Sequence, residues 1–465
     1  MSAPASTQFA PGSHVHFVGV SGAGMCGLAE AMARAGLVVT GSDLALGAQV
    51  EPLRALGVQL FEGHAAQQVE GATLLVRTAA VTEENPEVAA ALDHGVPVLK
   101  RAQALGQWVE RGRVVAIAGT HGKTTTTTLV TEVLVRAGLD PSAFVGGAVR
   151  AWGGNYRAGA DRVFVVEADE YDRSFHQLAP DVAVVTNVEA DHLDIYGDLS
   201  GVEEAFRIFL AARRDGGTVV ACADDVGAGR VVAGLEDVVS YGTRAGAVLR
   251  VLDITPKEGG SAFTLVERGH PAGRFQIHVP GHHNVLNATA AAGAARALGV
   301  GWEEVREGLA RYRGVGRRLE PLGRVGGIDV LDDYAHHPTE VTATLQALRQ
   351  AFPGRRLVAL FQPHLFSRTR DFQIEFGRAL AAADRLWVSD VYPARERPLP
   401  GVTGALIAEQ ARTQGASDVH YHADIATLAA AVAPTLEEGD VCVTLGAGSI
   451  EHVGPRLIRS LEEDT

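Results

Sequence analysis

The segment that most constrains this chain is Gly119-Thr120-His121-Gly122-Lys123-Thr124-Thr125, a Gly-rich turn that ends in Lys-Thr-Thr. Residues 114–118 precede it as an apolar run with strand character, and residues 126–135 are compatible with a helix. A strand, a Gly-rich turn and a helix form a P-loop, in which backbone N–H groups and the helix dipole hold phosphates, lysine reaches them and a hydroxyl binds Mg²⁺. An ordinary Gly-containing β–α turn is the competing interpretation. We therefore expect an α/β domain that binds ATP and Mg²⁺.

Two details qualify this P-loop. Among 41 basic residues only Lys100, Lys123 and Lys257 are lysines. A chain that otherwise uses arginine thus has a compact, flexible ammonium at the position that contacts phosphate. Ile117 occupies the position where the common pattern has its first glycine. The loop is therefore predicted to be a variant P-loop.

Length and composition exclude several classes of protein. The chain has 465 residues, enough for about three domains. The net charge of −14 argues against nucleic acid or an anionic membrane as a partner. No apolar run reaches membrane-spanning length, and residues 1–13 lack the basic start and apolar core of a signal peptide. Cys26, Cys222 and Cys442 are far apart in apolar surroundings, which favours buried thiols. We expect a cytoplasmic monomer or homodimer with no membrane insertion.

Strand-like and helix-like segments alternate along three stretches of the chain, and this alternation predicts parallel, doubly wound sheets. The expected strands include residues 14–20, 37–42, 58–61 and 74–78, then 163–167, 182–187 and 218–221, then 328–331, 357–361, 386–390 and 441–445. Between residues 248 and 279, short strands with Gly-rich turns indicate an antiparallel addition. We therefore predict three α/β domains: a Rossmann-like domain at 1–112, a P-loop domain with this addition at 113–314, and a Rossmann-like domain at 315–465.

A second Gly-rich turn, Gly22-Ala23-Gly24-Met25-Cys26-Gly27, follows the first predicted strand, and Asp43 follows the next. This pattern satisfies the dinucleotide fingerprint, in which glycines allow close approach of a diphosphate and an acid binds ribose hydroxyls. A nicotinamide dinucleotide, the diphosphate of a nucleotide sugar, and a tight β–α turn with an N-capping aspartate all fit the pattern. The residues alone leave these three interpretations open.

Acidic residues follow two strands of the predicted P-loop domain, in Glu167-Ala168-Asp169-Glu170 and Glu189-Ala190-Asp191-His192-Leu193-Asp194. Carboxylates at a strand's carboxyl end beside a P-loop are suitably placed for Mg²⁺, and Glu167 is the favoured ligand because it continues its strand. His192 is a candidate for a second metal or for orienting a phosphate. A solvated acidic loop and an exposed loop histidine are the alternatives.

Three further motifs follow. Gly281-His282-His283-Asn284-Val285-Leu286-Asn287 opens an Ala-rich helix, where Asn284 either caps the helix or, with Asn287 one turn later, contacts an adenine edge. Asp332-Asp333-Tyr334-Ala335-His336-His337-Pro338 and Phe361-Gln362-Pro363-His364-Leu365-Phe366-Ser367-Arg368-Thr369-Arg370 each follow a predicted strand. Arg368 or Arg370 is a candidate to bind a carboxylate, and a surface position is the alternative for either.

Together these motifs resemble, in the same order, those of the Mur ligase family of ATP-dependent amide-bond-forming enzymes. The resemblance extends from about His14 to the last predicted strand. It implies that the first domain binds UDP-N-acetylmuramate. The residues it would place at this substrate are Gly22, Ala23, Gly24 and Gly27 at the diphosphate, with Asp43 and His64 near the uridine.

The resemblance also implies the reaction: ATP phosphorylates a carboxylate, and the amine of L-alanine then attacks through a tetrahedral intermediate. It assigns catalysis to Lys123, Glu167, His192 and His336, and Mg²⁺ binding to Thr124, Glu167 and His192. It assigns ATP binding to Gly119, Thr120, His121, Gly122, Lys123, Thr124, Thr125, His283, Asn284, Asn287, Arg317 and Asp333. Tyr334, His336 and Arg368 would position the amino acid, with Arg368 on its carboxylate.

The chain departs from the family pattern at several positions. No lysine lies between Lys123 and Lys257, so the carbamylated lysine of other members is absent, as expected for the branch that adds L-alanine. Thr78-Ala79-Ala80-Val81 replaces a Ser-Ser-Ala-Ile-like stretch, and Leu365 stands where some relatives have a basic residue. A family member that adds a tripeptide, an NAD-linked oxidoreductase and a non-catalytic nucleotide-binding module are the competing hypotheses.

Overall fold

The computed structural model describes residues 9–257, 259–394 and 396–463. These residues form three sheets, of five, ten and six strands. The chain divides into two compact units. The first contains the residues up to Leu252 with Thr264–Phe275 and Leu286–Tyr312, and the second contains Asp253–Phe263, Gln276–Val285 and the residues from Arg313 onward. The expected fold class, an α/β chain with three sheet-based parts, is confirmed.

The five-stranded sheet is parallel throughout, in the order β3-β2-β1-β4-β5. β1 is central and buried from Val15 to Val18, which explains its apolar sequence. The chain order reverses on the two sides of β1, so the turn after β1 lies at a topological switch point, where open α/β sheets bind ligands. The strands are β1 His14–Val18, β2 Val38–Asp43, β3 Gln59–Glu62, β4 Leu74–Arg77 and β5 Val98–Lys100, and the α-helices are α1 Ala23–Arg34, α2 Glu51–Ala55, α3 Pro86–Asp93 and α4 Arg101–Val109.

The ten-stranded sheet has the order β15-β14-β13-β12-β11-β10-β6-β9-β7-β8. β6, which leads into the P-loop, is buried from Val114 to Ala118 between its parallel neighbours β9 and β10. The strands are β6 Arg113–Ala118, β7 Ser142–Val149, β8 Gly154–Arg157, β9 Val163–Glu167, β10 Val182–Val185, β11 Thr218–Cys222, β12 Val238–Gly242, β13 Leu249–Lys257, β14 Gly260–Glu267 and β15 His270–Ile277. The α-helices are α5 Lys123–Arg136, α6 Leu193–Tyr196, α7 Leu199–Ala211, α8 Val226–Val232, α9 His282–Ala297 and α10 Trp302–Arg311.

Some of these elements differ from the expectations. β7 and β8 form an antiparallel hairpin that the sequence did not indicate. α5 begins at Lys123, three residues before the expected start, and Gly122 at its N-terminal boundary has no side chain to cap the helix. The short strands expected between residues 248 and 279 are β13, β14 and β15, which extend the ten-stranded sheet. These strands and α9 contribute residues to both compact units.

Two glycines allow the five-stranded and ten-stranded sheets to pack together within the first unit. α1 packs on β7 and β8, and α4 packs on the 3₁₀ segment η4, Tyr171–Gln177. A Cβ on Gly27 of α1 would lie 3.1 Å from the Cβ of Tyr156, and one on Gly106 of α4 would lie 2.1 Å from the carbonyl oxygen of Gln177. The contact at Gly106 is therefore too close for a larger residue, and a Cβ on Gly27 would require Tyr156 to move by a few tenths of an ångström.

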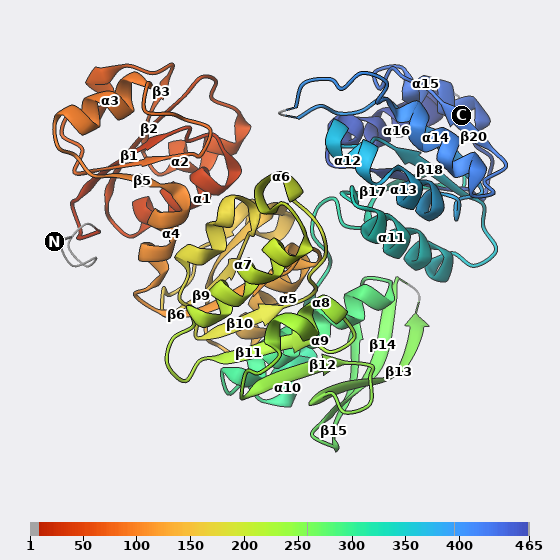
Figure 1. The fold of residues 1–465 in the computed structure, drawn as a ribbon, viewed down its shortest axis with the longest axis horizontal. Coiled ribbons are helices and arrows are strands. Elements are labelled where there is room, and N and C mark those ends of the chain that lie inside the picture. Colours follow the sequence, from red (N-terminus) through yellow and green to blue (C-terminus); the bar gives the residue numbers. More distant parts are fainter. Residues whose placement is uncertain (1–8, 258, 395, 464–465) are drawn as a thin grey trace. The chain divides into compact units, whose positions relative to one another are not determined.

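The six-stranded sheet of the second unit has the order β16-β17-β21-β18-β19-β20, parallel except for the antiparallel pair β16–β17. Alternate residues of β18 face opposite sides: Leu357 and Phe361 join a core with α11, α13 and α14, and Val358 joins one with α15 and α16 (Figure 1). The strands are β16 Glu320–Val325, β17 Ile328–Asp333, β18 Leu357–Phe361, β19 Arg385–Val388, β20 Val419–Tyr421 and β21 Val441–Leu445. The helices are α11 Pro338–Ala351, α12 Phe366–Asp371, α13 Gln373–Leu380, α14 Gly404–Thr413, α15 Leu428–Val432 and α16 Val453–Glu463.

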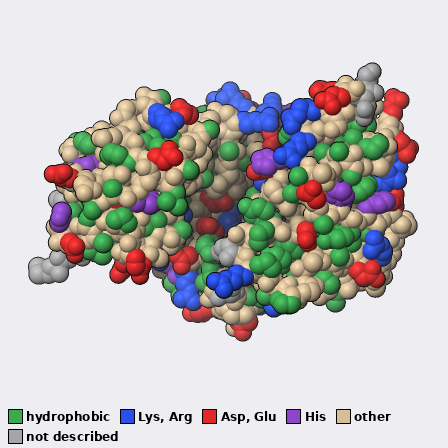
Figure 2. Space-filling view, turned by 90° about the horizontal axis from the view of Figure 1, so that it is seen from above, with side chains coloured by type: hydrophobic (Ala, Val, Ile, Leu, Met, Phe, Trp, Pro, Cys, Tyr) green, Lys and Arg blue, Asp and Glu red, His purple; other side chains and the backbone are tan. Residues whose placement is uncertain are grey.

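The kinds of side chain on the surface and the burial of the cysteines agree with what the composition indicates. On the face drawn in Figure 2, acidic, basic and hydrophobic side chains are interspersed. Cys26, Cys222 and Cys442 are free and buried, as expected. Within the described part of the chain, none of the helices combines the length and the apolar character needed to cross a bilayer.

Candidate functional site

The P-loop follows β6 as a turn in which two glycines are structurally required. Gly119 has φ +147° and Gly122 has φ +80°, values that residues with a side chain rarely adopt. A Cβ on Gly119 would lie 1.8 Å from Oγ1 of Thr186, and one on Gly122 would lie 2.5 Å from Oδ1 of Asn287. The glycines therefore allow the loop to pack closely on both neighbours, and α5 starts directly at Lys123 with its free backbone N–H groups at the loop.

The end of β10 holds this loop through hydrogen bonds. The backbone N–H of His121 donates to Oδ1 of Asn187 at 2.7 Å, and Oγ1 of Thr186 donates to the carbonyl oxygen of His121 at 2.6 Å. The backbone N–H of Glu189 donates to Oγ1 of Thr120 at 2.9 Å. Thr120 and His121 are thus fixed by a neighbouring strand of the sheet, which preorganises the loop for a ligand.

Lys123 forms a buried ion pair with Glu170. Its Nζ donates to both carboxylate oxygens, at 2.9 and 2.7 Å, and to the carbonyl oxygen of Gly119 at 2.7 Å. Burial opposes the charge on Lys123, but the carboxylates of Glu170 and Asp169 outweigh it and raise the pKa of the ammonium. Burial raises the pKa of Glu170 to about 7, against the attraction of Lys123. The lysine therefore keeps its charge inside the loop.

Glu167, at the end of β9, lies beside the first turn of α5. Oγ1 of Thr124 donates to Oε1 of Glu167 at 2.9 Å, and the backbone N–H of Gly146 donates to Oε2 at 2.6 Å. Burial raises the pKa of the Glu167 carboxyl, and the donated hydrogen bond from Gly146 opposes the rise. A hydroxyl and a carboxylate this close offer the oxygen donors that Mg²⁺ prefers, so this pair fits the expected metal.

His192 lies at the same edge of the sheet. It precedes α6 with φ +52°, and its Nε2 is 4.0 Å from Oε1 of Glu170. Its ring makes an edge contact with Tyr171 at a centroid distance of 5.2 Å. The structure thus places Lys123, Thr124, Glu167 and His192 at one edge of the sheet, where His192 and Lys123 both lie beside Glu170.

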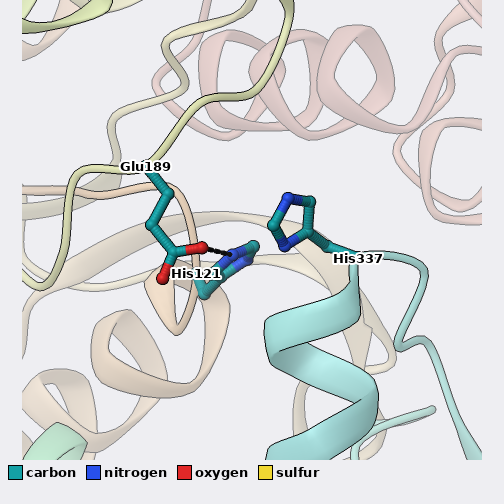
Figure 3. A group of neighbouring side chains, drawn as sticks. All are labelled: His121, Glu189 and His337. Atoms are coloured by element: carbon teal, nitrogen blue, oxygen red, sulfur yellow. Dashed lines mark ion pairs between the residues drawn. The ribbon is translucent and has the colours of Figure 1, made fainter. Parts of the chain in front are cut away.

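His121 and Glu189 form a second charged pair at the loop (Figure 3). Nε2 of His121 is 3.4 Å from Oε2 of Glu189, an ion pair when the imidazole is protonated. Figure 3 also draws His337, which precedes α11 in the second unit and accepts a hydrogen bond from the backbone N–H of Thr339 at 3.4 Å. His121 is therefore held on both sides, through its backbone by β10 and through its ring by Glu189.

The Gly-rich turn after β1 is braced by Asp43. Oδ2 of Asp43 accepts from the backbone N–H of Ser21 at 2.8 Å, and Oδ1 accepts from that of Leu44 at 2.8 Å. Gly22 immediately precedes α1, and the helix begins at Ala23. Asp43 thus stabilises the turn through Ser21 and does not cap α1, which has no side-chain cap. Its carboxylate lies at the switch point, so the geometry allows a ligand role.

His64 is tied to a buried glutamate rather than being free in a loop. Its Nδ1 lies 3.0 Å from Oγ of Ser42 and 3.1 Å from Oε2 of Glu87, and Ser42 donates to the same carboxylate at 2.6 Å. Glu87 is fully buried, but hydrogen bonds from His16 and Ser42 overcome burial and lower its pKa. The ionised Glu87 therefore orients the imidazole of His64.

The motif at the start of α9 contributes residues to both units. Asn287 is buried beside Gly122 in the first unit. In the second unit, Nδ2 of Asn284 donates to the carbonyl oxygen of Pro280 at 2.8 Å, which bonds the side chain to the preceding turn. Burial lowers the pKa of His283 to about 4, and the nearby charge of Arg318 adds to this shift. His283 is therefore neutral at pH 7.

In the second unit, residues after β17 form a cluster around Tyr334. The guanidinium carbons of Arg317 and Arg318 lie 5.0 and 5.4 Å from the centroid of its ring. Nε of Arg317 donates to Oδ2 of Asp332 at 2.9 Å, so this arginine already has a carboxylate partner. Asp333 is buried and accepts from the backbone N–H of Leu319 at 2.7 Å; burial raises its pKa to about 6. These contacts fix the peptide around Tyr334.

The candidates for binding a carboxylate differ in burial. Arg368, in α12, is buried. The side chain of Arg370 is 55% exposed and pairs with its neighbour Asp371 at 2.7 Å. His336 is held by Nδ1 at 2.9 Å from the carbonyl oxygen of Tyr334, and its ring contacts His364 at 5.7 Å. The geometry thus favours Arg368 over Arg370 as the residue that binds a carboxylate. Arg370 fits the alternative of a surface arginine.

Comparison with known proteins identifies the family. Three family models match consecutive parts of the chain: "Mur ligase family, catalytic domain" at residues 14–113, "Mur ligase middle domain" at 117–295 and "Mur ligase, glutamate ligase domain" at 317–448. A UDP-N-acetylmuramate–L-alanine ligase of Salinibacter ruber is 44% identical over 452 residues, which cover 97% of this chain and 95% of that protein. The chain belongs to the Mur ligase family.

Other Mur ligases agree in sequence and fold. A protein of Streptomyces coelicolor with the same name is 44% identical over 96% of this chain and 97% of its own length. The crystal structure of UDP-N-acetylmuramate-alanine ligase from Thermotoga maritima superposes with a TM-score of 0.81 at 29% identity, covering 97% of this chain and all of that one. A murein peptide ligase from Psychrobacter arcticus shares the fold, with a TM-score of 0.69 at 24% identity over 97% of this chain and 99% of that one.

Within this Mur ligase, some residues at the site do not stand out in the sequence. Glu170 is the acid that contacts Lys123, a contact that the sequence did not indicate. Thr186 and Asn187 hold the loop, although the sequence marks them only as the end of a strand. Their position at the carboxyl end of a parallel strand next to β6 is the one signal that distinguishes them.

Proposed function

We propose that the chain ligates L-alanine to the carboxylate of UDP-N-acetylmuramate at the expense of ATP. A carboxylate oxygen attacks the γ-phosphorus, ADP leaves, and an acyl phosphate forms. The amine of L-alanine then adds to the acyl carbon, and the tetrahedral intermediate expels inorganic phosphate to leave an amide. The observation that carries this proposal is the buried ammonium of Lys123 in a glycine-lined loop, in a chain 44% identical to ligases of this name.

The chemical difficulty is that a carboxylate and a triphosphate repel each other. Charge on Lys123 would offset this repulsion where negative charge develops on the transferred phosphoryl group. In the proposal, Mg²⁺ is held by Thr124, Glu167 and His192, and when bound it would neutralise phosphate oxygens. The 2.9 Å contact between Thr124 and Glu167 supports the oxygen part of this ligand set.

Lys123 would change partner during the reaction. Without nucleotide, its ammonium is satisfied by Glu170 and by the carbonyl oxygen of Gly119. A bound phosphate would compete for the same ammonium, and protonation of Glu170, whose pKa lies at about 7, would lower the cost of that exchange. Glu170 is thus proposed to hold the lysine in place for the nucleotide.

The remaining roles follow the three proposed domains. Residues 1–112 would bind the nucleotide sugar through Gly22, Ala23, Gly24, Gly27, Asp43 and His64. Residues 113–314 would bind ATP through Gly119 to Thr125, His283, Asn284 and Asn287. Residues 315–465 would contribute Arg317 and Asp333 to ATP, and Tyr334, His336 and Arg368 to L-alanine. A cytoplasmic location, with access to ATP, is part of the proposal.

The test is ADP release by the purified chain with ATP, Mg²⁺, UDP-N-acetylmuramate and single amino acids. We expect release that requires the nucleotide sugar and is fastest with L-alanine, with glycine and L-serine as comparison substrates. Turnover only with the tripeptide would instead assign the chain to the tripeptide-adding branch. ATP binding with no ADP release under any combination would indicate a non-catalytic module.

A further inference from the structure

Arg101 is the first residue of α4, and its side chain lies against the Gly-rich turn after β1. A Cβ on Gly24 would lie 3.0 Å from Nη1 of Arg101, so the glycine leaves room for the guanidinium. The first turn of α4 is fixed by the backbone N–H of Lys100, which donates to Oε1 of Gln103 at 2.9 Å. Arg101 is therefore held beside the turn by a regular helix.

The guanidinium lines a cavity of about 220 Å³ within the first unit. Gly24, Arg101 and Leu105 line it from the five-stranded part, and Gly146, Asn155 and Glu167 line it from the ten-stranded part. One cavity thus extends from the Gly-rich turn to the carboxylate beside the P-loop. A ligand in it would contact both groups of residues at once.

Arg101 has no hydrogen bond and no ion pair within 4.0 Å to any other residue that the structure describes. Burial lowers the pKa of its guanidinium, and the more distant carboxylates of Asp169 and Glu167 oppose the shift. Arg111, two residues after the end of α4, in contrast pairs with Asp161. A charged group that is largely withdrawn from water without a partner is costly, so a ligand is the expected partner.

We propose that Arg101 binds an anionic oxygen of the nucleotide-sugar substrate through its planar pair of N–H donors. This inference rests on the proposed function, which supplies a substrate with two such groups, the diphosphate and the carboxylate that becomes phosphorylated. Arginine suits both because its donors match phosphate and carboxylate oxygens in pairs. Arg101 and Gly24 would bind the substrate at one end of the cavity. The positive charge of Arg101 would also reduce the repulsion between the anionic substrate and Glu167.

The experiment is calorimetric titration of the full chain with UDP-N-acetylmuramate and with UDP-N-acetylglucosamine, which has the same diphosphate but no carboxylate. We expect Arg101→Met to weaken binding of UDP-N-acetylmuramate about 10- to 100-fold, as for loss of charged hydrogen bonds. Equal weakening for both ligands assigns Arg101 to the diphosphate. Weakening for UDP-N-acetylmuramate alone assigns it to the carboxylate.

Two control variants test whether the effect belongs to the paired donors of Arg101. Lys100→Met removes an adjacent exposed cation, which pairs with Asp172, and should leave both affinities unchanged. Arg101→Lys keeps the charge but lacks the paired donors, so we expect a loss of affinity that is smaller than in Arg101→Met. The affinity for ATP tests whether each variant is folded. Unchanged nucleotide-sugar affinity in Arg101→Met, with an altered Mg²⁺ requirement, would overturn the inference and indicate a counter-charge for Glu167. Failure of the unsubstituted chain to bind UDP-N-acetylmuramate would instead refute the proposed function.

Discussion

Replacing Gly122 by alanine tests whether the P-loop must pack closely on its neighbour. At φ +80° a residue with a side chain costs about 1–2 kcal/mol relative to its preferred conformations. The new Cβ would also lie 2.5 Å from Oδ1 of the buried Asn287, so the loop or the amide must shift by several tenths of an ångström. Such overpacking adds about 1–3 kcal/mol.

Gly138 provides a matched control for the backbone term. It follows α5, has φ +75°, and a Cβ there would meet no atom within 4 Å. The free energy of unfolding of Gly138→Ala therefore includes the cost of the positive φ and the change in unfolded-state entropy. It includes no contact of the kind that Gly122→Ala makes with Asn287. The difference between the two variants isolates the overpacking at the loop.

The assays are calorimetric melting and ADP release. We expect Gly122→Ala to melt at least about 2 °C below Gly138→Ala, since 1 kcal/mol shifts a domain of this size by about 2–4 °C. Turnover of Gly122→Ala should fall about 10- to 100-fold, as expected for displaced phosphate-binding groups, whereas Gly138→Ala should match the unsubstituted chain. Asn287→Ala in the Gly122→Ala background should restore part of the stability. Equal melting temperatures of the two variants and full turnover in Gly122→Ala would show that the loop does not need the close contact with Asn287.

Three further substitutions test the charges at the site. Lys123→Ala should lose at least about tenfold in ADP release, because it removes the ammonium that stabilises developing charge; an unchanged rate would exclude that role. Glu167→Ala should keep the fold by circular dichroism but need more Mg²⁺ for half-maximal rate, and an unchanged Mg²⁺ curve would count against it as a ligand. His283 has a pKa of about 4 when folded, below its unfolded value of about 6.5, so the folded state binds fewer protons and stability falls as the pH drops from 6.5 to 4. The urea midpoint of His283→Gln should therefore fall less between pH 7 and pH 5 than that of the unsubstituted chain, and an identical pH dependence of the two would refute this.

The sequence predicted those parts of the fold that local pattern determines. The run Leu357–Phe361 is apolar throughout because both faces of β18 are covered, and this burial makes the strand recognisable. The P-loop was recognised for a similar reason, since its glycines, lysine and hydroxyl are contiguous. The β7–β8 hairpin was missed because Gly146 and Gly147 interrupt the alternation that marks a strand.

Contacts between distant residues could not be predicted from spacing. Lys123 meets Glu170 across 47 positions, and His121 meets Asn187 across 66, so only the order of strands in the sheet brings them together. The residue pattern alone also leaves Arg368 and Arg370 as alternatives, because the two lie in one short helix and differ in burial; only the family resemblance favours Arg368. The tertiary arrangement supplied what the motifs could not.

The proposed reaction depends on ATP activating the carboxylate of the nucleotide sugar before the amine attacks. The most direct measurement uses UDP-N-acetylmuramate labelled with ¹⁸O in that carboxylate, followed by mass spectrometry of the phosphate released with L-alanine. We predict that one ¹⁸O moves into each inorganic phosphate, because the acyl C–O bond breaks when the amide forms. Phosphate free of ¹⁸O, formed at the same rate as the amide product, would show that no acyl phosphate forms.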